Sequence, residues 1–259
     1  MTVTDRARVL LDLHRSPELL ILVNVWDAVS ARVAASVEGV TALATASHSV
    51  AATLGHEDGE RIPRDEMLDM VRRVVAATDL PVTADLEAGY GDPAETMRRA
   101  IDVGAVGANL EDQMKPLPEA VAAVEAALGA ADAAGVPEFV LNARTDAFLR
   151  AGDRPHDDVL ADALERGAAY LAAGAPVVFV PGHVTEDDVA TFVAEWGPQR
   201  LSLIAAPGCV PLPRMAELGV ARVSFGPFSQ SVALMAFQDL VEGATQRGEA
   251  LPADYRTLN

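Results

Sequence analysis

The sequence contains one cysteine, Cys209, among its 259 residues. A single cysteine excludes an internal disulfide bond and a zinc site built from several cysteine ligands. The chain also contains one lysine, Lys115. Chemistry that needs a lysine Schiff base, including that of pyridoxal phosphate, therefore has only one candidate residue.

Positive charge is also scarce. The chain has 20 Lys and Arg against 38 Asp and Glu, which gives a formal net charge of −18. Nucleic acids and anionic membrane surfaces bind clustered basic side chains, so we expect neither partner. No apolar run approaches the ~20 residues of a membrane-spanning helix, and the N-terminal residues show no export signal. These absences predict a cytoplasmic protein that acts on a small molecule.

Hydrophobic residues, in contrast, make up half of the chain, which is enough for a large core. Apolar runs of strand length alternate eight times with segments of helical character, at a spacing of about 20–30 residues, as in a (β/α)8 barrel. A doubly wound sheet is the alternative fold, but it rarely supplies eight consecutive units. We therefore expect a single TIM-barrel domain over residues 1–259, with an N-terminal helix and a long C-terminal helix.

The apolar runs and the Gly and Pro residues between them set the expected boundaries. Strands are expected over residues 19–25, 41–47, 81–87, 107–112, 138–145, 176–181, 201–206 and 222–225. Helices are expected over residues 3–14, 28–37, 92–103, 117–134, 156–172, 213–218 and 228–245, and also from residue 63 and from residue 185. Residues 48–62, rich in Gly, His and acids, are expected to form a polar loop.

Carboxylates stand at the ends of two neighbouring expected strands. The run PVTADLEAGY brings Asp85 and Glu87, and the run GANLEDQ brings Glu111. An ionised carboxylate at the end of a buried strand is costly unless a cation or hydrogen-bond donors meet it. Because barrel strands end on one rim, and because oxygen ligands suit Mg²⁺ or Mn²⁺, we predict a divalent-metal site here. The alternative is that these acids only cap loops and helices.

Five motifs, taken in order, resemble the isocitrate lyase / phosphoenolpyruvate mutase superfamily: NVWDAVSA, TASHSVAATLGHEDGE, TADLEAGYGD, GANLEDQ and NARTDAF. The resemblance extends from about Asn24 to Gly226. It implies a (β/α)8 barrel that binds Mg²⁺ and makes or breaks C–C or C–P bonds next to a 2-oxo or enol carboxylate, through an enolpyruvate-like species. It also implies a homo-oligomer, a dimer or tetramer. The last helix is either exchanged between subunits, as in relatives, or covers the chain's own barrel with its apolar residues.

The resemblance assigns metal roles to the three acids. By this likeness Asp85 is the direct metal ligand, while Glu87 and Glu111 hold the metal through water. Asp58 matches the acid of the mobile loop after the second strand, and Arg144 matches the arginine that binds the 2-oxo or enolate oxygen.

The likeness also suggests residues that contact the substrate. Trp26 flanks the substrate, and the turn Ala46-Ser47-His48 offers backbone N–H groups to its carboxylate. His183 is a further candidate contact, or only a neighbour of a helix N-cap. Lys115 is the one residue of the loop after the fourth strand with suitable catalytic chemistry, although it is equally well explained as a solvated loop residue.

That same loop departs from the family pattern. The segment QMKPLPEA lacks the cysteine and histidine of the KKCGH-type lyase loop, and it is shorter than the mutase loop and lacks its asparagine. We therefore expect a Mg²⁺-dependent lyase, but not an isocitrate lyase. Its substrate is expected to be a small 2-oxo or 2-hydroxy (di)carboxylate, like oxaloacetate or methylisocitrate, that undergoes C–C cleavage or decarboxylation. The alternatives are a phosphoenolpyruvate or phosphonate mutase or hydrolase, and a catalytically silent barrel that binds oxo acids.

Overall fold

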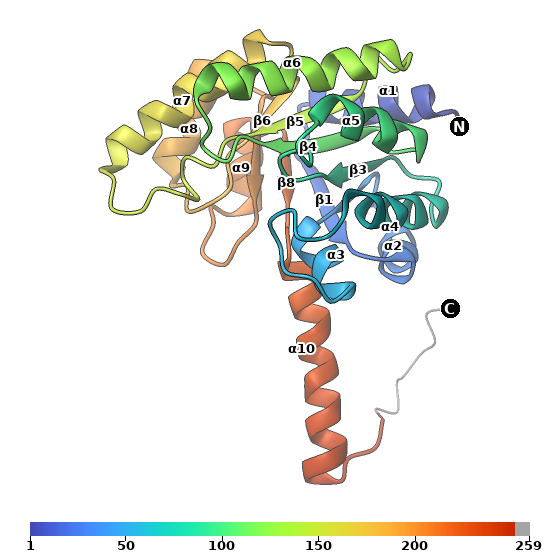
Figure 1. The fold of residues 1–259 in the computed structure, drawn as a ribbon. Helices are drawn as coiled ribbons and strands as arrows, with labels where there is room; N and C mark the ends of the chain where they lie inside the picture. The colour runs from blue at the N-terminus through green and yellow to red at the C-terminus, as the bar shows by residue number, and fades with distance from the viewer. Residues whose placement is uncertain (252–259) are drawn as a thin grey trace.

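The computed structural model describes residues 1–251; residues 252–259, the end of the expected domain, lie outside the described residues. Within the described part, eight parallel strands form a closed barrel in which each strand pairs with the next and β8 pairs with β1 (Figure 1). The strands are β1 Leu20–Val25, β2 Leu43–Thr45, β3 Val82–Asp85, β4 Gly107–Glu111, β5 Val140–Arg144, β6 Val177–Phe179, β7 Leu201–Ile204 and β8 Arg222–Ser224. The predicted (β/α)8 barrel is confirmed.

Helices follow the strands and surround the barrel. They are α1 Val3–Arg15, α2 Ala28–Ala35, α3 Ser47–Thr53, α4 Arg64–Ala76, α5 Pro93–Asp102, α6 Leu117–Ala133, α7 His156–Ala172, α8 Glu186–Trp196, α9 Leu212–Leu218 and α10 Phe228–Glu242, with the π-helix η1 Gly243–Arg247 at the end. Side chains four residues apart on a helix share a face, and in α5 Met97 and Ile101 are both buried on the face toward the core. The short apolar strands therefore form the inner barrel, and the amphipathic helices form the layer that covers it.

The predicted polar loop over residues 48–62 is wrong at its start, where Ser47–Thr53 form α3. Val50 and Ala51 are fully buried in this helix. These two residues pack into the core and stabilise the helix. The prediction of a loop rested on the many polar and glycine residues around them. Only the remainder, before α4, is a loop.

The N-terminal helix α1 packs at the end of the barrel where the strands begin. A Cβ on Gly107, the first residue of β4, would lie 2.9 Å from Leu10 of α1, so this end leaves no room for a larger residue. His14 of the same helix is buried, and burial together with the nearby charge of Arg222 lowers its pKa to about 3. The open mouth of the barrel is therefore at the opposite end, where the strands finish.

Helix α10 extends away from the barrel as a single rod (Figure 1). Its apolar residues Val232, Met235 and Phe237 are 68%, 64% and 62% exposed. Of the helices that the structure describes, none is long and apolar enough to cross a membrane.

Candidate functional site

A cavity of about 370 Å³ lies at the mouth of the barrel. Strand ends and the loops that follow them supply its lining, and this is the face on which TIM barrels carry their active sites. Among the residues that the sequence predicted for the site, the lining includes Ala46, Ser47, His48, Asp58, Asp85, Arg144 and His183. We refer to it as the mouth cavity.

Asp85, the last residue of β3, is held in place by donors from the start of α3 and from β4. Its Oδ2 accepts hydrogen bonds from the backbone N–H of Ser47 at 3.0 Å and from the Ser47 hydroxyl at 2.8 Å. The side-chain amide of Asn109 donates to Oδ1 at 3.4 Å. Both Ser47 donors are therefore engaged with Asp85, so the turn that was expected to bind a substrate carboxylate fixes the carboxylate of Asp85 in this structure.

Below Asp85 the barrel interior is polar, a feature that the sequence analysis missed. Arg222 of β8 reaches across the barrel, and its Nη2 donates to Asn109 Oδ1 on β4 at 3.3 Å. Asn142 of β5 donates to the same oxygen at 2.8 Å. Burial lowers the pKa of Arg222 to about 10, which leaves the guanidinium charged near neutral pH. Asp85 thus faces a buried cation through the amide of Asn109.

Glu87 lies just beyond β3 and points away from water. It is only 2% exposed and has a left-handed backbone, with φ of 52°. Its carboxylate accepts hydrogen bonds from the backbone N–H of Glu60 and, at 3.0 Å, from the Tyr90 hydroxyl. Burial raises the pKa of Glu87 to about 7, and the negative charges of Asp58 and Asp85 act in the same direction. The loop that carries Asp58 and Glu60 therefore closes over this side of the site.

Glu111 and Arg144 form an ion pair at the ends of β4 and β5, where the two residues are partners in the sheet register. Arg144 Nη1 lies 2.8 Å from Glu111 Oε2, and Arg144 Nε donates to Asp146 at 2.7 Å. Burial raises the pKa of Glu111 to about 7 although Arg144 lowers it. Arg144 itself is buried, yet Glu111 and Asp146 raise its pKa. Asp146 therefore orients the Arg144 guanidinium.

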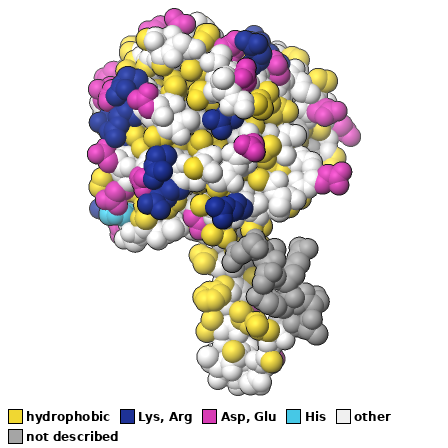
Figure 2. All heavy atoms as spheres, turned by 90° about the vertical axis from the view of Figure 1, so that its right-hand side faces the viewer, with side chains coloured by type: hydrophobic (Ala, Val, Ile, Leu, Met, Phe, Trp, Pro, Cys, Tyr) yellow, Lys and Arg dark blue, Asp and Glu magenta, His cyan; other side chains and the backbone are white. Residues whose placement is uncertain are grey.

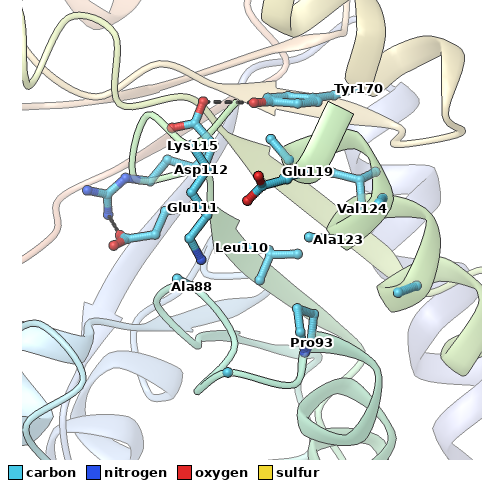
Figure 3. Close-up of a pocket in the computed structure, with 15 residues that line it drawn as sticks. Ala88, Pro93, Leu110, Glu111, Asp112, Lys115, Glu119, Ala123, Val124 and Tyr170 are labelled. Carbon is cyan, nitrogen blue, oxygen red and sulfur yellow. Dashed lines mark hydrogen bonds and ion pairs between the residues drawn. The ribbon is translucent and has the colours of Figure 1, made fainter. Parts of the chain in front are cut away.

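Two predicted site residues lie elsewhere. Trp26 lines a groove between α2 and the start of α10 rather than the mouth cavity. Lys115 lines a neighbouring cavity of about 350 Å³ beside α6, which Glu111 and Arg144 also border. Figure 3 shows the Lys115 side chain extending into that second cavity. The structure therefore separates Trp26 from the other predicted residues, whereas Lys115 lies outside the mouth cavity but shares a cavity with Glu111 and Arg144.

The acid cluster suits a cation held mainly through water. Residues 1–251 contain no group of three or more His, Cys, Asp or Glu side chains arranged to hold a metal ion directly. Mg²⁺, however, usually keeps several waters and is bound by only one or two carboxylates. Asp85 provides one oriented carboxylate at the cavity, Glu87 is a buried acid without a cationic partner in the described chain, and Glu111 is ion-paired with Arg144. This donor set fits Mg²⁺, and Asp85 is the carboxylate that would hold it.

The two raised pKa values predict how the stability of the metal-free chain depends on pH. Between pH 4.5 and about 7 the folded chain holds protons on Glu87 and Glu111 that the unfolded chain releases. The free energy of unfolding must therefore fall as the pH rises through this range. Glu87→Gln, which mimics the protonated form, should be more stable than the unmodified chain at pH 8 by about 1–3 kcal/mol, and nearly equal at pH 4.

Urea unfolding in EDTA at pH 4, 6 and 8 measures this difference. Glu125→Gln, on the exposed side of α6, is the matched control and should show no pH-dependent difference. A Glu87→Gln variant that is no more stable than the unmodified chain at pH 8 would contradict the assignment of an uncompensated buried carboxyl.

Comparison with known proteins identifies relatives over nearly the whole chain. The family model described as phosphoenolpyruvate phosphomutase matches residues 10–245. A phosphoenolpyruvate phosphomutase of Streptomyces hygroscopicus is 31% identical, over 91% of this chain and 79% of the relative. The 2,3-dimethylmalate lyase of Eubacterium barkeri is 27% identical, over 80% of this chain and 74% of the relative.

Solved structures show the same fold. A candidate phosphonomutase from Burkholderia cenocepacia J2315 is 41% identical, with a TM-score of 0.87 over 93% of this chain and 99% of the other. An oxaloacetate acetylhydrolase in complex with its product oxalate is 25% identical, with a TM-score of 0.86 over 98% of this chain and 91% of the other.

Proposed function

The chain belongs to the phosphoenolpyruvate phosphomutase family, and from this membership we propose that it is a Mg²⁺-dependent carbon–carbon lyase. Its relatives are lyases, decarboxylases and mutases, so the chain is an enzyme of this superfamily. The substrate that we propose is a small 2-oxo or 2-hydroxy carboxylate or dicarboxylate, cleaved or decarboxylated through an enolpyruvate-like species. The cytoplasmic location stays a prediction.

The observation that carries the proposal is the arrangement of Asp85 and Arg144 at one cavity. When bound, Mg²⁺ would act as a Lewis acid toward the oxygens of the substrate. Ser47 and Asn109 hold the Asp85 carboxylate in a fixed orientation. Arg144, fixed by Glu111 and Asp146, directs a permanent positive charge at the position where an enolate oxygen gains negative charge. A site prepared in this way stabilises the enolate without rearranging during the reaction.

The proposal gives Asp58 a role in the reaction and gives Lys115 none. Asp58 lines the mouth cavity from the loop before α4, and we propose that it helps to hold water at the metal side of the site. Lys115 lines the neighbouring cavity, so we give it no direct part in the reaction.

A phosphonate mutase is the second candidate function, because two similar proteins carry mutase names. Mutase and lyase share the enolate-binding half of the site and differ in the group that is transferred. Phosphorus NMR of the chain with phosphoenolpyruvate distinguishes them, because a new C–P resonance would favour the mutase. The loop between β4 and α6, residues 112–116, is short, which favours the lyase.

Calorimetric titration with oxalate, a mimic of the pyruvate enolate, tests the proposal. We expect binding that requires Mg²⁺ and disappears in EDTA. Metal-dependent binding would justify a screen of oxo acids for cleavage products. No binding to the folded chain at saturating Mg²⁺ would overturn the enolate mechanism and favour a catalytically silent barrel.

Helix α10 supports a further part of the proposal, which is self-association. Figure 2 shows hydrophobic side chains along the part of α10 that projects from the barrel. An isolated helix that exposes Leu234, Met235 and Phe237 to water is unfavourable, since most helical stability comes from packing an apolar face. We propose a homodimer or homotetramer in which α10 packs against a second copy.

Replacing Leu234, Met235 and Phe237 together with serine should therefore convert the oligomer to a monomer. The barrel should remain folded, because these residues make no part of its core. Size-exclusion chromatography with light scattering measures the mass. Gln238→Ala, on the same helix, is the control and should keep the oligomer; an unmodified chain that is monomeric at micromolar concentration would contradict the proposal.

A further inference from the structure

The mouth cavity has two chemically different halves. The half formed by the first five strands carries the polar and charged residues of the site. The other half comes from the loop after β5, from β6, β7 and β8 with the loops that follow them, and from the start of α10. It is lined mainly by apolar side chains, namely Leu149, Phe179, Val184, Ile204, Pro207 and Phe228, and its polar members are His183, Cys209 and Ser224. We refer to this second half as the apolar wall.

Backbone geometry holds the apolar wall together. Gly182, after β6, has φ of +116°, and a Cβ there would lie 3.1 Å from the backbone of Phe148 and Leu149. This close approach joins the loop after β6 to the loop after β5, and it brings Leu149 to the cavity. Phe179 is the sheet partner of Arg144, so the wall begins directly beside the arginine of the proposed reaction site.

The charges around the cavity indicate which kind of substrate group can bind against the apolar wall. Arg144 is the only arginine or lysine in the described lining, and it is already paired with Glu111 and Asp146. Asp58 and Asp85 add negative charge. A carboxylate placed against the apolar wall would lose its hydration and find no unpaired arginine or lysine among the described lining residues, which is costly, whereas a hydrocarbon group placed there gains free energy.

We propose that the substrate carries an alkyl or aryl group, and no further carboxylate, on the side away from its reacting 2-oxo or 2-hydroxy acid. Phe179, Val184 and Ile204 bind this group and set the specificity of the reaction. The inference rests on the proposed function, because the acid end of the molecule must occupy the Asp85 and Arg144 side of the cavity. It narrows the substrate class from small dicarboxylates to acids with an apolar tail.

Two oxamates with tails of equal shape test the inference. N-isobutyl oxamate and N-oxalylglycine share the head of oxalate, and their tails are a branched hydrocarbon and a carboxylate with the same arrangement of heavy atoms. Calorimetric titration of both, and of oxalate, is carried out on the full chain with saturating Mg²⁺. We expect N-isobutyl oxamate to bind about 10-fold or more tightly than N-oxalylglycine, as full burial of a leucine-sized group implies.

The possible outcomes separate this inference from the proposed function. If oxalate binds and N-oxalylglycine binds as tightly as the isobutyl compound, the apolar-tail inference is overturned and the proposed function stands. If none of the three ligands binds to the folded chain, the proposed function fails and the inference fails with it. Tighter binding of the isobutyl compound supports both.

A matched pair of variants locates the preference in the wall. Ile204→Thr makes one wall position polar and shortens the side chain by one carbon, and it should reduce the preference for the isobutyl tail by about threefold or more. Val37→Thr makes the comparable change at an exposed position after α2, outside the mouth cavity, and should leave the preference unaltered. An equal preference in Ile204→Thr and in the unmodified chain would remove Ile204 from the proposed wall.

Discussion

Asp85→Ala should lose metal-dependent oxalate binding and all measurable turnover while the barrel stays folded. Lewis-acid stabilisation by a bound metal ion is worth several kcal/mol, which corresponds to a loss of about 10³-fold or more in rate. Stability should fall without unfolding the barrel, because the buried Arg222 loses the negative charge that it faces through Asn109. Asp85 lies at the end of β3 beside the cavity, and its removal frees donors of Ser47 and Asn109 that water can reach.

A second substitution distinguishes charge from shape at this position. Asp85→Asn keeps the size of the side chain and an acceptor for Ser47, but it removes the negative charge that a metal needs. We expect it to lose metal binding almost as completely as Asp85→Ala. Asp102→Asn, an exposed acid at the end of α5, should bind oxalate as the unmodified chain does. Titration with Mg²⁺ and oxalate, together with thermal unfolding, measures both effects; full turnover in Asp85→Asn would contradict the role of Asp85.

The sequence was sufficient to predict the barrel because each strand carries its own signal. Runs such as the one that becomes β4 are short and apolar, and a glycine or proline follows nearly every helix or strand. The acids after β3 and β4 were predicted to meet for a topological reason: neighbouring parallel strands end on the same rim. Asp85, Glu87 and Glu111 do lie at adjacent strand ends in the structure.

Contacts across the barrel were beyond sequence reasoning. Arg222 and Asn109 are 113 residues apart, and nothing in either strand shows that one donates to the other. Side-chain direction was equally inaccessible. Trp26 directly follows β1 and Asp85 ends β3, yet Trp26 lines a groove beside α10 and Asp85 lines the mouth cavity, because a residue at a strand end can turn to either side of the rim. The apolar wall was missed since its residues read in the sequence as ordinary strand and loop positions.

Arg144→Gln should reduce kcat by about 10²–10³-fold, the loss that follows removal of one preorganised donor to a developing oxyanion. Arg144→Lys should recover only part of the activity. The guanidinium uses Nη1 for Glu111 and Nε for Asp146, and a lysine ammonium lacks this planar fork. KM should change less than kcat if the contact with the oxygen strengthens in the transition state.

Arg150→Lys is the control that makes this result specific. Arg150 also pairs with Asp146, at 3.2 Å, but its side chain is about half exposed and does not line the mouth cavity. Both substitutions therefore disturb an ion pair to Asp146, whereas the proposed contact with the reacting oxygen involves Arg144 alone. Steady-state kinetics on the acid that the screen identifies should show near-normal kcat for Arg150→Lys. Equal losses of kcat in Arg144→Lys and Arg150→Lys would mean that Arg144 acts only by pairing with Asp146. The contact with the enolate oxygen would then have to come from another donor.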